Sequence, residues 1–282
     1  MIATTRPQGY AGELGDFDAR SLADLSRGRA FRYASLLVEA RHPGQPGRQR
    51  EVLERLARAW VEPTSRRLFR TPLQVSMMTA LVAEVGTPPA SRYRVFSDYY
   101  RLMYRRELER PNLAHAELLR DLQKPIDEVH RLAGFWLQAR SESAGGAAAL
   151  LSRDELGELI QQVLVRFGYD DAAERAQWAE RILEAALERL VLLVHAEPDR
   201  YGFELRSLQE LMAAEALAAG EDQTVKERLR HVAPIDAWRN VLLFLAGKCF
   251  AHTDHLGAFL VNELCPWLND GIEEPTVCRP LT

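Results

Sequence analysis

Apolar residues recur every three or four positions along most of this chain. Leu73, Met77 and Leu81, for example, would share one face of a helix. Such stripes, bounded by Gly and Pro, predict helices over residues 26–41, 51–61, 72–85, 93–104, 152–167, 178–190, 207–219, 225–232, 235–245 and 257–267. Residues 111–140 are predicted to hold a loop and then one long helix, and residues 141–149 an exposed loop. The chain is therefore expected to be mainly α.

One stretch has the alternation of a strand pair instead. A short apolar run rich in Val and Leu leads into a Pro-Asp turn, and then Tyr201, Phe203 and Leu205 alternate with Gly, Glu and Arg. Alternation with a period of two across such a turn predicts a β-hairpin. Ser207 follows, with Glu210 three residues later, which predicts a capping box at the start of a helix. Helix, hairpin and capped helix together are the outline of a winged-helix unit.

Other helix ends carry capping residues as well. Ser26 is predicted to cap the first helix, and Thr71 followed by Pro72 is the pattern of an N-cap with proline at the first helical position. Gly86 is predicted to end that helix. Residues 152–155 read Ser-Arg-Asp-Glu, which predicts a second capping box.

Composition and charge exclude several classes of protein. The 282 residues are 47% apolar and 27% charged, which is enough to bury a sizeable core, and the net charge of −4 implies no general attraction to nucleic acid or to anionic membranes. The three cysteines are too few for a disulfide framework. No signal peptide and no apolar run of about 20 residues, the length of a membrane span, is present in the sequence. We expect a cytoplasmic protein without nucleic-acid or membrane partners.

Three short motifs follow one another along the chain. Residues 2–7 read Ile-Ala-Thr-Thr-Arg-Pro, which is typical of a strand end stopped by proline; residues 70–73 read Arg-Thr-Pro-Leu; and residues 203–214 read Phe-x-x-x-Ser-Leu-Gln-Glu-Leu-Met-Ala-Ala. In this order and at this spacing they resemble the NACHT-type STAND ATPases, which are signal-transduction switches related to NLR receptors. The resemblance covers residues 2–265, but only the distal half of the family's module.

The resemblance implies a division of the chain into four parts. Residues 1–20 would be the end of a nucleotide-binding core, with its sensor-1 strand and a linker, and residues 21–110 a helical domain. Residues 111–220 would be a winged-helix domain with one β-hairpin, and residues 221–282 the start of a second helical domain. The expected fold is thus a helical domain plus a winged-helix-like domain, followed by further helices.

The resemblance also implies roles for individual residues. Arg6 would approach the γ-phosphate of ATP, since a fixed guanidinium can distinguish a triphosphate from a diphosphate. Pro72 would pack its rigid ring against the adenine base. The family's winged helix carries a His that reaches the β-phosphate of ADP, but Leu205 stands at that position here. The phosphate contact is therefore not carried over to this chain.

The sequence contains no Walker A motif, G-x-x-x-x-G-K-[S/T]. In the family, the groups that hold ATP and Mg²⁺ would precede Met1, so the chain is expected to be the C-terminal part of an ATP-dependent switch that works by oligomerising, in bacteria for antiviral defence or regulation. By itself it should neither bind ATP or ADP tightly nor catalyse hydrolysis. The expected partners are a nucleotide-binding core or further copies of the chain, together with other proteins.

Alternatives remain open at this point. The chain could be a complete α-helical adaptor that binds proteins and has no nucleotide role, or a winged-helix regulator that binds DNA. The helix after Ser207 argues against DNA reading, because it carries Glu and no Lys or Arg. Cys249, His252, His255 and Cys265 could hold a metal ion, or could be an ordinary helix end with surface histidines.

Overall fold

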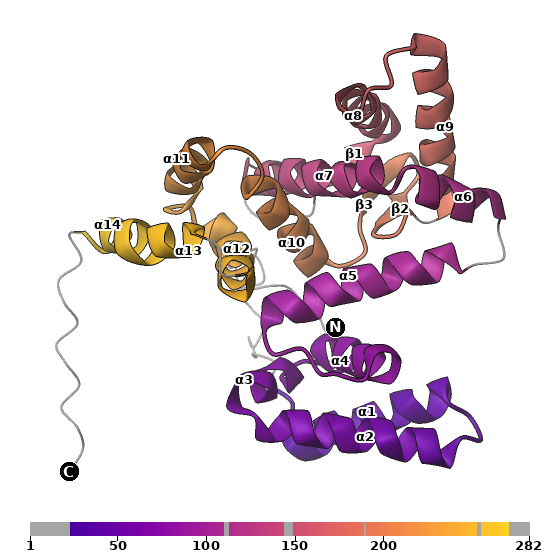
Figure 1. The fold of residues 1–282 in the computed structure, drawn as a ribbon, viewed down its shortest axis with the longest axis vertical. Coiled ribbons are helices and arrows are strands. Elements are labelled where there is room, and N and C mark those ends of the chain that lie inside the picture. Colours follow the sequence, from indigo (N-terminus) through magenta and orange to yellow (C-terminus); the bar gives the residue numbers. More distant parts are fainter. Residues whose placement is uncertain (1–22, 110–112, 144–148, 189, 253–254, 271–282) are drawn as a thin grey trace, which may run out of the picture.

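The computed structural model describes residues 23–109, 113–143, 149–188, 190–252 and 255–270 (Figure 1). Helices dominate these residues, as the apolar periodicity predicts, and a small three-stranded sheet accompanies them. The predicted fold class, mainly α with one β-hairpin, is confirmed.

The first part of the chain is an all-helical unit, drawn at the bottom of Figure 1. It is built from α1 (Arg27–Arg41), α2 (Pro46–Val61), α3 (Pro63–Arg66), a 3₁₀ turn (Arg67–Phe69), α4 (Pro72–Val85) and α5 (Arg92–Leu108). Its core includes a cluster of three aromatic rings: Phe69 lies 5.4 Å from Trp60 and 6.1 Å from Phe31, measured between ring centroids. Stacked and edge-on aromatic pairs of this kind stabilise a core beyond the area they bury.

The predicted caps explain where these helices begin. The hydroxyl of Ser26 accepts a hydrogen bond from the backbone N–H of Arg29, and Thr71 caps α4 in the same way. Gly86 ends α4 in the left-handed conformation, with a φ of 83°. All three predictions are confirmed. In contrast, α2 begins five residues before the predicted start, because Pro46 takes the first helical position.

A winged-helix unit follows. Its elements are α6 (Leu113–Asp121), α7 (Gln123–Ser143), β1 (Leu151–Ser152), α8 (Arg153–Arg166), α9 (Ala172–Glu188), β2 (Leu193–Glu197) and β3 (Arg200–Phe203). The strands form one antiparallel sheet in the order β1–β3–β2, with Leu151 opposite Tyr201 and Leu193 opposite Phe203. The order helix, strand, helix, helix, strand, strand with this sheet is the topology of a winged helix.

The ends of this unit differ partly from the prediction. The hairpin and the capping box of Ser152 and Glu155 are confirmed. The long helix predicted after a loop within residues 111–140 is confirmed as α7, but the loop before it is wrong, because Leu113–Asp121 form the separate helix α6. The exposed loop predicted over residues 141–149 is wrong in its first residues, since α7 continues to Ser143.

The remaining helices are drawn in orange and yellow (Figure 1). They are α10 (Arg206–Leu217), α11 (Asp222–Val232), a 3₁₀ turn (Asp236–Trp238), α12 (Arg239–His252), α13 (Leu256–Phe259), a π-helical turn (Leu260–Leu264) and α14 (Cys265–Asn269). Helix α10 packs on α7, on α12 and on α5, so it touches both units. The four-part domain division stays a prediction.

The predicted capping box at the start of α10 is wrong. Leu205, not Ser207, is the N-cap, and it offers no side-chain hydrogen bond to the first turn. Glu210, which a capping box would turn back to the helix start, is 4% exposed and accepts a hydrogen bond of 3.2 Å from the Asn240 amide of α12. The Glu210 carboxylate therefore contacts α12 instead of capping the start of α10.

Candidate functional site

Pro72 opens α4 in the way the nucleotide-contact prediction requires. Thr71 is extended and its hydroxyl accepts from the backbone N–H of Gln74 at 3.2 Å, so the first turn is capped before the proline begins it. Both Thr71 and Pro72 are exposed. Proline at the first helical position leaves no unsatisfied N–H, and its ring presents a rigid apolar face to whatever lies outside.

The described chain enters the helical unit beside this proline. The backbone N–H of Leu25 donates to the carbonyl of Arg70 at 2.8 Å, and the Arg70 guanidinium pairs with Asp24. Residues 24–25 thus run directly past the turn that leads into α4. Arg6, the other residue predicted to contact nucleotide, lies outside the described residues, and its role stays a prediction.

Leu205 joins the hairpin to α10. Its backbone is extended, and its side chain is partly buried against the apolar core. The next residue, Arg206, lies 3.6 Å from the carboxylate of Glu210 on its own helix. An isobutyl group cannot donate a hydrogen bond to a phosphate, so this position supplies no polar contact to an anion.

A groove lies where the two units and α10 meet. It encloses about 480 Å³, and α5, α7 and α10 all contribute to its walls. Its lining combines three phenols, three arginines, two carboxylates, two small polar side chains and an apolar strip: Tyr93, Tyr100, Tyr104, Arg101, Arg105, Arg131, Asp127, Glu215, Ser97, Gln123, Leu108, Leu211 and Met212. Clefts between structural units with a few convergent polar groups are where small ligands usually bind.

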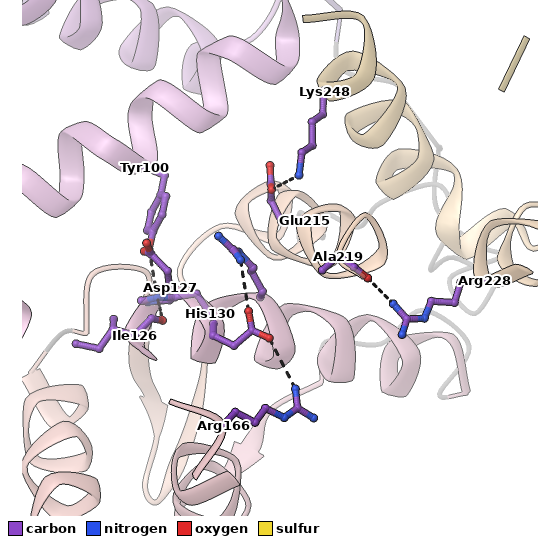
Figure 2. Close-up of polar contacts among 11 residues, drawn as sticks. Tyr100, Ile126, Asp127, His130, Arg166, Glu215, Ala219, Arg228 and Lys248 are labelled. Carbon is purple, nitrogen blue, oxygen red and sulfur yellow. Dashed lines mark hydrogen bonds and ion pairs between the residues drawn. The ribbon is translucent and has the colours of Figure 1, made fainter. Parts of the chain in front are cut away.

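One end of the groove is closed by a polar contact that joins three helices. Glu215 of α10 accepts from the Tyr93 hydroxyl of α5 at 3.0 Å and from the Lys248 ammonium of α12 at 2.6 Å (Figure 2 shows the contact with Lys248). Burial, and then the neighbouring Glu215 carboxylate, raise the pKa of Tyr93, so the phenol stays protonated and remains a donor.

The other end holds a second tyrosine and carboxylate. The hydroxyl of Tyr100, on α5, donates to Asp127 on α7, and it also lies 3.5 Å from Nδ1 of the buried His130 (Figure 2). Burial raises the pKa of Tyr100 well above its usual range, and the Asp127 charge raises it further. Because the phenol keeps its proton, it has one hydrogen to donate and two neighbours that can accept it.

Only an indirect signal of this groove is present in the sequence. The tyrosines between residues 93 and 104 recur at helical spacing, which is typical of a core face, and Tyr93 and Tyr104 are buried. Periodicity could not show that their polar ends would meet Asp127 and Glu215. Those two carboxylates are separated from the tyrosines by 23 residues or more along the chain, and only the packing of α5 against α7 and α10 brings them together.

The helix that would read DNA in this topology is α9, since it directly precedes the hairpin. Helix α10, whose lack of Lys and Arg after Ser207 argues against DNA reading, is instead a buried joining helix. On α9, Glu174, Glu180 and Glu184 are exposed. Arg175 donates to backbone carbonyls before the helix, and the guanidinium of Arg181 lies over the Trp178 ring. These side chains favour no anionic partner, and the absence of a nucleic-acid partner stays a prediction.

The structure shows where the cysteines and histidines of the possible metal site lie. Cys249 is buried and Cys265 is exposed. His252 meets the Tyr93 ring edge-on, and His255 lies 2.6 Å from the Asp222 carboxylate. Across the ranges that the structure describes, no three His, Cys, Asp or Glu side chains are grouped in a way that could hold a metal ion.

No protein-family model matches the chain, and no curated protein matches it significantly. Among the described helices, none is both long enough and apolar enough to cross a membrane.

Proposed function

We propose that this chain is the helical and winged-helix arm of a NACHT-type, ATP-dependent signalling switch. In this proposal α1–α5 and the winged helix pack against a P-loop nucleotide-binding core. The core binds ATP or ADP with Mg²⁺, and exchange of the nucleotide changes how the arm packs and whether the protein oligomerises. The arm supplies contacts to the nucleotide and carries out no chemistry of its own.

The observation that carries the proposal is the exposed Pro72 at the first position of α4. A flat apolar ring in this place can cover a purine base without leaving a backbone donor unsatisfied. The backbone N–H of Leu25 is hydrogen-bonded to the carbonyl of Arg70 at the same turn. The chain that follows the predicted sensor segment therefore passes beside the proline. A core preceding residue 23 would join the arm close to this face.

The partly buried Leu205 makes the proposal more specific. A switch that lacks a polar group here cannot use this position to hold the β-phosphate of ADP. We therefore expect this arm to hold the ADP state less tightly than an arm with His at the same position, so that ADP leaves faster.

The first test is to sequence the DNA immediately upstream of the Met1 codon. The proposal expects a reading frame, intact or frameshifted, that encodes G-x-x-x-x-G-K-[S/T] and an acidic Walker B strand. A frame without them would overturn the proposal, because no other part of this chain can hold the triphosphate and Mg²⁺.

The second test uses the arm joined to that core. Pro72→Ala is expected to lower ADP and ATP affinity to a similar extent, since the base is common to both, while Pro63→Ala should leave affinity unchanged. Pro63 is a matched control, because it also occupies the start of a helix and is exposed. Equal affinity of the Pro72 and Pro63 variants, measured by titration with a fluorescent nucleotide, would show that the proline does not contact the base.

Leu205→His is the complementary gain-of-function variant. An imidazole at this position could donate to the β-phosphate, and it is expected to slow ADP release with little effect on ATP binding. Release of fluorescent ADP, followed by stopped flow, measures the effect. An unchanged release rate would place position 205 away from the phosphates.

A second function, that of an interaction module that associates with itself or with other proteins, is favoured by one specific observation. Leu243 and Phe250 lie two turns apart on α12 and are 55% and 64% exposed. If this face joins copies of the chain, Phe250→Ser should weaken concentration-dependent self-association in sedimentation experiments. Leu36→Ser, on an exposed leucine of α1, is the control and should leave association unchanged.

A further inference from the structure

His130 lies in the middle of the winged-helix unit and is fully buried. Its ring faces two carbonyl oxygens at once: Nδ1 is 2.7 Å from the oxygen of Ile126, and Nε2 is 2.8 Å from the oxygen of Leu190 (Figure 2 shows the first contact). A neutral imidazole carries a single N–H and can donate to only one of them.

The ring is neutral in this setting. Burial lowers the pKa of His130, and the two carbonyls and Asp127 oppose that effect only in part. The ring therefore exists in one of two tautomers, and in each the nitrogen without a proton needs a donor of its own. A buried acceptor that finds no donor costs roughly 1–3 kcal/mol.

A different donor stands beside each nitrogen. The backbone N–H of Leu192 lies 3.4 Å from Nε2, and the hydroxyl of Tyr100 lies 3.5 Å from Nδ1. With the proton on Nδ1, the ring donates to Ile126 and accepts from Leu192. With the proton on Nε2, it donates to Leu190 and accepts from Tyr100.

The hydroxyl of Tyr100 decides between these two arrangements. It donates to Asp127 in this structure, so it is not available to Nδ1. The Nδ1–H tautomer gives each ring nitrogen a partner, and the Leu190 oxygen, which then faces the unprotonated Nε2, keeps the backbone N–H of Leu193 at 3.0 Å. If another donor takes the Asp127 oxygen to which Tyr100 donates and displaces the hydroxyl, the hydroxyl can turn to Nδ1. The Nδ1 proton then passes to water and Nε2 takes a proton from water when the site opens transiently, so the ring stays neutral and its donated hydrogen bond moves from Ile126 to Leu190.

The two ends of this chain of contacts lie in different environments. Tyr100 and Asp127 line the groove between α5, α7 and α10, and Asp127 is partly exposed there. Leu190 and Leu192 belong to the tight turn at the base of the hairpin, in which Leu190 and Leu193 exchange two backbone hydrogen bonds. Val191 in this turn has a φ of 54°, a strained conformation for a β-branched residue.

We propose that Tyr100, Asp127 and His130 form a hydrogen-bond relay that reports the state of the groove to the base of the hairpin. A ligand group that donates to Asp127, such as an ammonium or a guanidinium, releases the Tyr100 hydroxyl and switches the tautomer of His130. The backbone N–H of Leu192 then loses its acceptor and the carbonyl of Leu190 gains a donor. The strained turn is the element that responds, whether or not the chain belongs to a nucleotide switch.

The test is ¹⁵N NMR of the histidine ring in the full chain. The wild-type protein is expected to carry the proton on Nδ1. Asp127→Ala removes the acceptor of Tyr100, so His130 should switch to the Nε2–H tautomer, and the Leu192 amide should exchange faster with solvent. Asp127→Leu repeats the test with a side chain that fills the space of the carboxylate without accepting a hydrogen bond, in case the alanine variant folds poorly.

The double variant Asp127→Ala with Tyr100→Phe separates the relay from a simple loss of charge. Without the phenol hydroxyl no donor reaches Nδ1, and the proton should return to that nitrogen. Asp98→Ala is the matched control, since Asp98 is a carboxylate on α5 that pairs with Arg101, and it should leave the tautomer unchanged.

Three results would each overturn the proposal: an Nε2–H tautomer in the wild-type protein, an unchanged tautomer after Asp127→Ala and Asp127→Leu, or the same switch with and without the Tyr100 hydroxyl. The first would mean that Tyr100 does not donate to Asp127. The other two would mean that the tautomer of His130 is set by something other than the phenol.

Discussion

The helical unit and the joint between α7 and α10 are both buried, but they are built from different chemistry. The helical unit surrounds the ring of Phe69 with apolar side chains. The joint buries the amides of Gln138 and Gln209, which meet each other at 3.2 Å, and the carboxylate of Glu210. Apolar contacts supply most of the free energy of folding. A buried polar group, in contrast, is stable only next to a partner that completes its hydrogen bonds, so such pairs select one way of packing the two helices.

The largest expected effect tests the apolar side of this comparison. Phe69→Ala removes the ring that contacts Phe31 and Trp60, and it should lower the free energy of unfolding by about 3–5 kcal/mol. Chemical denaturation measures the loss. Phe250→Ala, on an exposed ring, is the control and should change stability by less than about 1 kcal/mol. Similar losses in both variants would mean that the aromatic cluster is not a core.

The second prediction concerns how closely α7 and α10 approach. A Cβ added at Gly134 would lie 2.6 Å from the Cβ of Met212 and 2.9 Å from the backbone oxygen of Gln209. Gly134→Ala should therefore force the helices apart and cost about 1–3 kcal/mol, although alanine is the better helix former. Gly28→Ala, in α1 with open space around it, should stabilise the protein by up to about 1 kcal/mol. The two alanine substitutions should thus differ in sign in the same denaturation assay.

The third prediction tests the polar side. Gln138 donates to the carbonyl of Ala237 at 2.7 Å and accepts from Gln209. Gln138→Ala leaves these groups without a partner and should cost about 1–2 kcal/mol. Replacing both glutamines by leucine should cost less than the sum of the two single leucine variants. If the stability losses of the two single variants instead add up in the double variant, the two amides do not act as a pair. The joint would then not differ from the helical unit in this respect.

The smallest expected effect is a pH dependence in α8. Arg140 and the backbone N–H of Ser152 hydrogen-bond to Glu155 and lower the pKa of its carboxyl to about 2, from an ordinary value of 4.5. A depressed pKa stabilises the fold at pH above about 4.5, and this stability is lost as the pH falls towards 2. Because the side chain is one-third exposed, the contribution should be at most about 1 kcal/mol.

Glu155→Gln should remove this part of the acid dependence when stability is measured between pH 6 and pH 3, a range that spans most of the titration of a free glutamate. Glu158→Gln is the charge-matched control, because Glu158 is an exposed carboxylate three residues after Glu155. This variant should keep the acid dependence. A pH profile of Glu155→Gln that matches the wild type would show that the ion pair with Arg140 does not contribute.

Local patterns predicted the parts of the fold that depend on near neighbours. Caps such as Ser26 and Thr71 bond to residues three positions away, and the hairpin closes over a two-residue turn, so the information lies within a few residues. The capping box predicted at Ser207 is absent, and the Glu210 carboxylate instead accepts a hydrogen bond from Asn240, which is 30 residues away. Similarly, α6 was missed, and it packs on α5 and α7, contacts that a short segment of sequence does not report.

The sequence indicated the candidate site only in part, for the same reason. The Thr71-Pro72 pair is a local signal and predicted the start of α4, whereas contact of Pro72 with a nucleotide stays a prediction. The groove, with Asp127 and Glu215 against the tyrosines of α5, depends on the meeting of three distant helices. His130 gave no signal, because nothing in its neighbourhood of sequence shows that Leu190 and Leu192 will face its ring.

The sequence by itself determined most of the helices, the capped starts of α1, α4 and α8, the hairpin and the apolar core, because hydrophobic burial and backbone capping are encoded at fixed spacings along the chain. The tertiary structure alone decided which polar groups meet. A buried amide, phenol or imidazole depends on the groups that hydrogen-bond to it. For Gln138, Tyr100 and His130 such a group comes from another element of the fold.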